Sequence, residues 1–139
     1  MPALSAPFNF VINTGTFTAT SVAIPSAAIA PDGSKQFKSN PEKGDGYFGA
    51  ADGLHTVTYT VTPNFAGTLT MQATLATAPV ETDWFNIVDT TVNYVYPITP
   101  ASTTTHYVNF VGNFVWVRAA VHRSDDDPNG SVMFINYNH

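Results

Sequence analysis

Hydrophobic and polar residues alternate along most of the chain with a period of two, the pattern of half-buried β-strands. The clearest case is residues 55–62, in which threonine occupies every even position. Residues 63–67 are turn-prone, and the alternation then resumes over 68–75 with apolar residues at the odd positions. The pattern predicts two matched strands joined as a β-hairpin, with a threonine-covered outer face.

A second hairpin is predicted near the end of the chain. Residues 114–122 and 131–137 form its strands, and the polar residues 124–130 form its turn. Further strand candidates are residues 8–12, 16–24, 84–88, 91–96 and 106–110. The sequence therefore predicts an all-β fold: a single antiparallel β-sandwich, jelly-roll-like, of about eight strands. The pattern leaves the choice between a jelly-roll and an immunoglobulin-like strand order open.

Two segments depart from the pattern. Residues 31–53 are rich in glycine, hold all three lysines and follow no period, so we expect a long loop with at most a short strand near Tyr47 and Phe48. Residues 1–7 are expected to be a flexible or partner-bound tail ahead of a domain spanning 8–139. The tail lacks the basic and apolar regions of a signal peptide. No apolar run is long enough to span a membrane.

The composition favours a protein that works in an assembly. Charged residues make up 11% of the chain, against about 25% in an average soluble domain. Threonine and asparagine replace them, and such a surface resists self-association poorly. The net charge is −5, and acidic residues lie among the few basic ones, so we expect no nucleic-acid partner. The absence of cysteine excludes disulfides and zinc–thiolate sites.

The turn at 125–130 is a candidate calcium site. Asp125, Asp127 and Asn129, followed by Gly130, match the first half of a calcium-binding loop. The position that should hold a bidentate glutamate is Asn136, so a polar hairpin turn is the favoured interpretation of the segment. The four histidines show no metal-binding spacing, and three copies of the terminal His139 could bind an ion only by meeting on a symmetry axis. We therefore expect no metal and no cofactor.

Carboxylates lie on both sides of an aromatic pair, Trp84 and Phe85. Glu81, Asp83 and Asp89 could supply a glycosidase pair or flank a sugar-stacking site. The same residues are also those of an ordinary turn that enters a strand. No nucleophile elbow, phosphate loop or dinucleotide motif accompanies them. The sequence thus predicts a non-enzymatic protein, with a small hydrolase using Asp83 or Glu81 as the remote alternative.

The strand predicted over 114–122 is apolar on both faces. Valine and alanine form one face, and the other carries Phe114, Trp116 and Arg118. Such a strand must be covered on both sides, either by a loop or by another subunit. We take Phe114, Trp116, Arg118, Trp84 and Phe48 as candidate interface residues.

Two pairs of segments resemble small β-sandwich proteins of tailed-bacteriophage virions. The first pair is GTLTMQATL at 67–75 followed by DWFNI at 83–87, and the second is YVNFVGNFVWVRAAV at 107–121 followed by GSV at 130–132. The resemblance covers the second half of the chain and concerns its strands. It implies a structural virion protein, made in the host cytoplasm, whose partners are copies of itself and other virion proteins.

The resemblance allows several roles. A capsid decoration, or cement, protein is the first expectation. Alternatives are a tail, collar or fibre accessory protein, or a carbohydrate-binding β-sandwich module with a glycan partner.

Mass in solution tests these expectations. We expect light scattering to show an oligomer whose mass EDTA does not change, because assembly would rest on neutral surfaces and not on calcium. A monomer that loses thermal stability in EDTA would contradict assembly and support the calcium loop.

Overall fold

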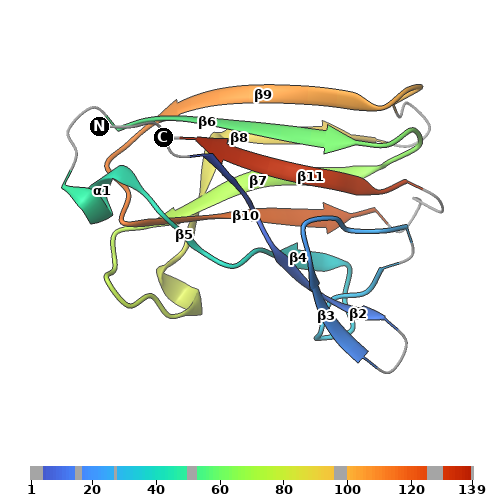
Figure 1. Ribbon diagram of the computed structural model, residues 1–139, viewed down its shortest axis with the longest axis horizontal. Coiled ribbons are helices and arrows are strands. Elements are labelled where there is room, and N and C mark those ends of the chain that lie inside the picture. Colours follow the sequence, from blue (N-terminus) through green and yellow to red (C-terminus); the bar gives the residue numbers. More distant parts are fainter. Residues whose placement is uncertain are drawn as a thin grey trace.

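Alternating apolar residues meet between two antiparallel sheets in the computed structural model of the protein, which describes residues 5–14, 17–26, 28–49, 53–95, 100–124 and 130–138 (Figure 1). One sheet has the order β1-β11-β6-β9, and the other has the order β4-β10-β7-β8 with β5 also paired to β10. The sandwich strands are β1 Ser5–Pro7, β4 Gln36–Lys38, β5 Glu42–Lys43, β6 Leu54–Val61, β7 Gly67–Thr74, β8 Phe85–Tyr94, β9 Thr104–Val111, β10 Trp116–Arg123 and β11 Val132–Asn138. A separate hairpin, β2 Phe10–Thr14 with β3 Phe17–Ser21, projects at the lower right of Figure 1.

The strand order is that of a jelly roll. Apart from the short β5, the sandwich has eight strands, and its first strand, β1, pairs with its last, β11. Successive strands then cross repeatedly from one sheet to the other, which is the double Greek-key arrangement of that fold. The predicted all-β sandwich is confirmed, and the open question of strand order is answered.

Both predicted hairpins are wrong. β6 pairs with β11 and β9, whereas β7 lies in the opposite sheet and pairs with β10 and β8. β10 and β11 are likewise in different sheets. Alternation determines which face of a strand is buried, but it does not determine which other strand lies beside it. A short connection can cross the roughly 10 Å between packed sheets as readily as it can reverse within one.

The strands predicted at 84–88 and 91–96 form the single strand β8. Its pairing with β7 shifts register between Leu69 and Met71. There the fully buried Thr90 accepts a hydrogen bond from the Met71 amide at 2.9 Å, while its own hydroxyl donates to the Ile87 carbonyl at 2.6 Å. The Tyr59 hydroxyl crosses the core to donate to the Thr90 carbonyl at 2.9 Å. Thr90 therefore links β8 to β7 and to the opposite sheet at the register shift. This is the point at which the alternation predicted two separate strands.

The predicted long loop is instead packed structure. It contains β4, β5 and a one-turn helix, α1 Asp45–Phe48, where a short strand was expected. The Phe37 side chain is 1% exposed in the core, and the Ala119 amide of β10 donates to the Ser39 hydroxyl at 2.8 Å. A Cβ on Gly46 would stand 2.3 Å from the Asn113 carbonyl oxygen, so α1 lies hard against the chain before β10. One apolar residue among polar ones is too little pattern to reveal such a strand.

The tail also differs from expectation at its inner end. Ser5–Pro7 form β1, an edge strand on β11. Neither α1 nor the 3₁₀ turn η1 Glu81–Asp83, the helical segments in the described ranges, is long enough to cross a membrane.

Replacing the core aromatic of β4 tests whether residues 31–53 are held as the structure shows. Phe37→Ala should lower the free energy of unfolding by about 3–5 kcal/mol, because it leaves a cavity in the core. The neighbouring exposed Gln36→Ala should change it by less than about 0.5 kcal/mol. Urea unfolding measures both, and equal small effects would favour a loosely attached loop.

Candidate functional site

The outer face of the five-stranded sheet presents polar side chains in registered rows. One row runs across four strands through Gln36, His122, Thr68 and Asn93. Beside it lies the row of Lys38, Ala120 and Thr70, and a third row joins Arg118, Gln72 and Asn86. Because alternate residues of a strand share a face, every one of these side chains lies on the side away from the core.

A hollow of about 250 Å³ lies on this face. Ala120 is one of its lining residues and lies between Lys38 and Thr70 of the paired strands, so its small side chain leaves room between longer neighbours. The lining residues are Gln36, Phe37, Lys38, Thr68, Thr70, Gln72, Asn86, Ala120, Val121 and His122. The hollow therefore offers mainly hydroxyl and amide groups, with one ammonium and one imidazole.

The segment between β7 and β8 is fastened to the sheet by Arg118. The side chain of Arg118 is 8% exposed and donates to the Glu81 carboxylate from Nη1 at 3.2 Å and Nη2 at 2.9 Å. Its Nε donates to the Gln72 Oε1 at 2.7 Å, and the guanidinium lies 4.3 Å from the centre of the Trp84 ring. Lys38 adds an ion pair to the same carboxylate. These contacts hold Gln72 and Lys38, two residues that line the hollow, in place.

Glu81 serves structure rather than proton transfer. Hydrogen bonds from Arg118 and then Lys38 lower the pKa of Glu81 from 4.5 to about 2. A carboxyl group that stays ionised cannot act as a general acid near neutral pH. Asp83 accepts a hydrogen bond from the Val80 amide at 2.8 Å, as part of the η1 turn. The arrangement thus gives no support to the glycosidase alternative.

Three of the five candidate interface residues, Trp84, Trp116 and Arg118, lie where the segment between β7 and β8 contacts the sheet. Trp84 and Arg118 stack, and Trp116, two residues along β10, donates from its ring nitrogen to the Thr77 carbonyl at 3.1 Å. The segment following β7 thus covers part of this outer face, which is the loop option that the sequence left open. The role of these residues in an interface stays a prediction.

The other two candidates lie outside this group: Phe48 reaches Trp116 through Tyr47, and Phe114 packs against the core near Phe110. Phe48 is 44% exposed and contacts Tyr47, whose ring centre is 5.2 Å from that of Trp116. Phe114 is half-buried and packs edge-on to Phe85 at 5.9 Å. The calcium candidates Asp125, Asp127 and Asn129, like His139, lie outside the described residues. Within the described ranges no three His, Asp or Glu side chains form a group that could hold a metal.

Sequence reasoning missed the residues that line the hollow. Gln36, Ala120 and Asn86 belong to three different strands and come together only through pairing that the sequence did not reveal. The only signal in the sequence is that each of these residues occupies a solvent-facing position in the alternation of its strand.

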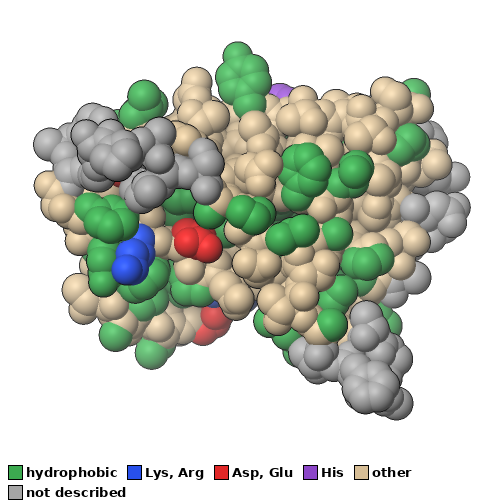
Figure 2. All heavy atoms as spheres, in the orientation of Figure 1, with side chains coloured by type: hydrophobic (Ala, Val, Ile, Leu, Met, Phe, Trp, Pro, Cys, Tyr) green, Lys and Arg blue, Asp and Glu red, His purple; other side chains and the backbone are tan. Residues whose placement is uncertain are grey.

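The opposite sheet has a different outer face. The strands β1, β11, β6 and β9 contain no Lys, Arg, Asp or Glu, and Tyr107 stands 68% exposed opposite Thr58. The charged residues that lie within strands all belong to the five-stranded sheet. On the face shown in Figure 2, charged side chains are few and lie to the left, over the end where Figure 1 places α1 and β5.

Comparisons with known proteins place the fold. No protein-family model matches the chain, and no curated protein matches it in sequence. Among solved structures, the K1 cleaved adhesin domain of Lys-gingipain from Porphyromonas gingivalis is 9% identical with a TM-score of 0.53, and the match covers 99% of this chain and 98% of that one. A family 29 carbohydrate-binding module from Piromyces equi is 12% identical with a TM-score of 0.48 (99% and 91% covered). The xylan-binding module CBM15 is 10% identical with a TM-score of 0.49 (99% and 97% covered). At these identities the likeness concerns the fold alone.

The ion pairs of Glu81 make a pH-dependent contribution to stability. Glu81→Gln should lower the free energy of unfolding by about 0.5–1 kcal/mol at pH 7, the range for pairs with an exposed partner, since the Glu81 side chain is 62% exposed. Its pKa is lowered on folding, so the stabilisation is present above pH 4.5 and is lost as the pH falls towards 2.

Urea unfolding of both proteins at several pH values between 7 and 2.5 measures this difference. The exposed Asp89→Asn on β8 is the control, and an equal effect there would show a general charge effect instead of the Arg118 contact.

Proposed function

We propose that the protein is a non-catalytic carbohydrate-binding module whose sugar ligand occupies the hollow over Ala120. The observation that carries the proposal is the lining itself: neutral amides and hydroxyls on an open sheet face, without a pair of carboxylates placed for chemistry. Sugar hydroxyls both donate and accept hydrogen bonds, as do amide and hydroxyl side chains. The match in chemistry needs no metal and no cofactor.

The polar side chains are ordered before any ligand arrives. The Gln72 Nε2 donates to the Asn86 Oδ1 at 2.9 Å, and the Thr68 hydroxyl donates to the Asn93 Oδ1 at 2.6 Å. Because both asparagines accept through Oδ1, each presents its NH₂ group as a donor. Side chains already fixed in this way lose little conformational entropy on binding.

The fold is compatible with this function. Carbohydrate-binding modules share the β-sandwich architecture, and the proposal assigns to this chain what their names say of them. The capsid decoration role and its virion location stay predictions, as do the tail, collar and fibre alternatives, since no sequence relative bears on them. Glycan binding and a place in a virion are compatible, because one outer face of the sandwich could hold sugar while the other meets a partner.

Filling the hollow should abolish binding. We expect the wild-type protein to bind at least one neutral polysaccharide in a panel of glucans, xylans and mannans. Ala120→Tyr should weaken that binding at least tenfold by occupying the hollow, and Asn86→Ala should weaken it about tenfold through the loss of one hydrogen bond. Isothermal titration calorimetry measures the affinities, and circular dichroism checks that each variant is folded.

Two residues of the opposite sheet are matched controls. Asn109 accepts a hydrogen bond from the Thr56 hydroxyl at 2.6 Å, as Asn86 does from Gln72, and Tyr107 is an exposed aromatic. Asn109→Ala and Tyr107→Ala should bind like the wild type. Loss of binding in Tyr107→Ala with retention in Ala120→Tyr would move the site to the other sheet and contradict the proposal.

A further inference from the structure

We propose that the hollow is the middle of a continuous groove that takes an internal stretch of a long, uncharged polysaccharide. This inference rests on the proposed carbohydrate-binding function and extends it to the size and charge of the ligand. It is argued from two further hollows that share lining residues with the first.

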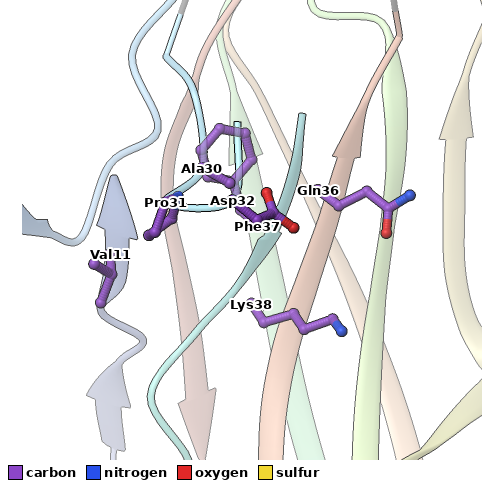
Figure 3. Close-up of a pocket in the computed structure, with 7 residues that line it drawn as sticks. All are labelled: Val11, Ala30, Pro31, Asp32, Gln36, Phe37 and Lys38. Atoms are coloured by element: carbon purple, nitrogen blue, oxygen red, sulfur yellow. The ribbon is translucent and has the colours of Figure 1, made fainter. Parts of the chain in front are cut away.

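One neighbouring hollow lies on the far side of β4. It has a volume of about 240 Å³ and is lined by Val11, Ala30, Pro31 and Asp32 together with β4. All three β4 residues, Gln36–Lys38, line the central hollow as well. In Figure 3 the side chains of Gln36 and Lys38 extend from β4 to the side opposite Val11. The two hollows are therefore joined across the narrow strand β4.

The other neighbouring hollow lies at the opposite end of the central one. It also measures about 240 Å³, and Thr68 and His122 line both. Its remaining lining comes from Gly67, Asn93, Tyr94, Val95 and Ser124. The central hollow thus continues into another hollow at each end. A ligand that extends beyond the central hollow would contact the lining of these end hollows in both directions.

A registered row of polar side chains connects the three hollows. Gln36 borders the first, His122 and Thr68 line the centre, and Asn93 borders the last. The row crosses three strand-to-strand intervals of about 4.8 Å, roughly 14 Å in all. A line of hydrogen-bonding groups at regular intervals suits a polymer whose hydroxyls repeat, and it exceeds what a single sugar unit can contact.

The charges along the groove favour an uncharged polymer. Lys38 is paired with Glu81, and Asp32 accepts hydrogen bonds from the Ser34 amide at 2.9 Å and hydroxyl at 2.6 Å. Hydrogen bonds from Ser34 lower the pKa of Asp32, so a negative charge stands at one end. With the chain carrying a net −5, a polyanionic glycan would meet repulsion, and Lys38, the one Lys or Arg among the described residues that line the three hollows, is already paired.

Affinity as a function of ligand length tests the groove. The probes are cello-, xylo- and manno-oligosaccharides of two to six units, measured by calorimetry against the wild type. For the series that binds, we expect at least a tenfold gain in affinity between the disaccharide and the hexasaccharide. Asp32→Ala and Asn93→Ala should each weaken hexasaccharide binding severalfold and leave disaccharide binding unchanged, because these residues line the end hollows and not the central one. Asn109→Ala on the other sheet should change neither.

The outcomes separate this inference from the proposed function. Equal affinities for disaccharide and hexasaccharide, both abolished by Ala120→Tyr, would overturn the groove and leave carbohydrate binding in place. Tighter binding of heparin or alginate than of any neutral glycan would overturn the assignment of an uncharged ligand. If neither the panel of polysaccharides nor the oligosaccharides bind, the proposed function fails and the groove fails with it.

Discussion

The outer face of the five-stranded sheet depends on the burial of one guanidinium group. A charge that is almost removed from water must be paired and hydrogen-bonded, or its burial costs several kcal/mol. Arg118 meets that requirement with Glu81, Gln72 and the ring of Trp84. Satisfying it fixes the segment between β7 and β8 against the sheet and orients Gln72, which in turn orients Asn86. The buried charge of Arg118 thus positions the segment between β7 and β8 and orients two amide side chains that line the hollow.

The sequence determined the local structure well and the pairing poorly. Alternation over 55–62 and 68–74 predicted two strands with the correct core-facing residues, because burial of alternate residues is a local property. Leu75, also expected to face inward, lies beyond β7 and is 66% exposed. Which strand lies beside which depends on contacts between residues far apart in the chain, and no local pattern encodes them. The same limit hid β4, whose single buried residue, Phe37, does not make a period.

The candidate site shows the same division. Alternation over 114–122 predicts Trp116 and Arg118 on one face, and Trp84 is among the predicted interface residues, so three of the residues that hold the segment between β7 and β8 follow from the sequence. The contact between Arg118 and Glu81 does not follow from the sequence, because the two residues are far apart in the chain and no local pattern joins them. Gln36, Thr68 and Asn86 could not be predicted, since solvent-facing polar residues look alike until the register of the strands brings them together on one face.

Ala120 is the point at which local preference and the proposed function disagree. Alanine is disfavoured in strands, where β-branched residues pack better against their cross-strand neighbours. Here it sits in the central part of β10, between Lys38 and Thr70 in the paired strands, where a larger side chain would bury more apolar surface. Sites that break a local rule without a structural gain are commonly functional. The core explains the adjacent Ala119, which is fully buried, but it does not explain Ala120, which faces outward. The physical effect of the small residue is to keep space open in the hollow, and the proposed sugar ligand requires that space.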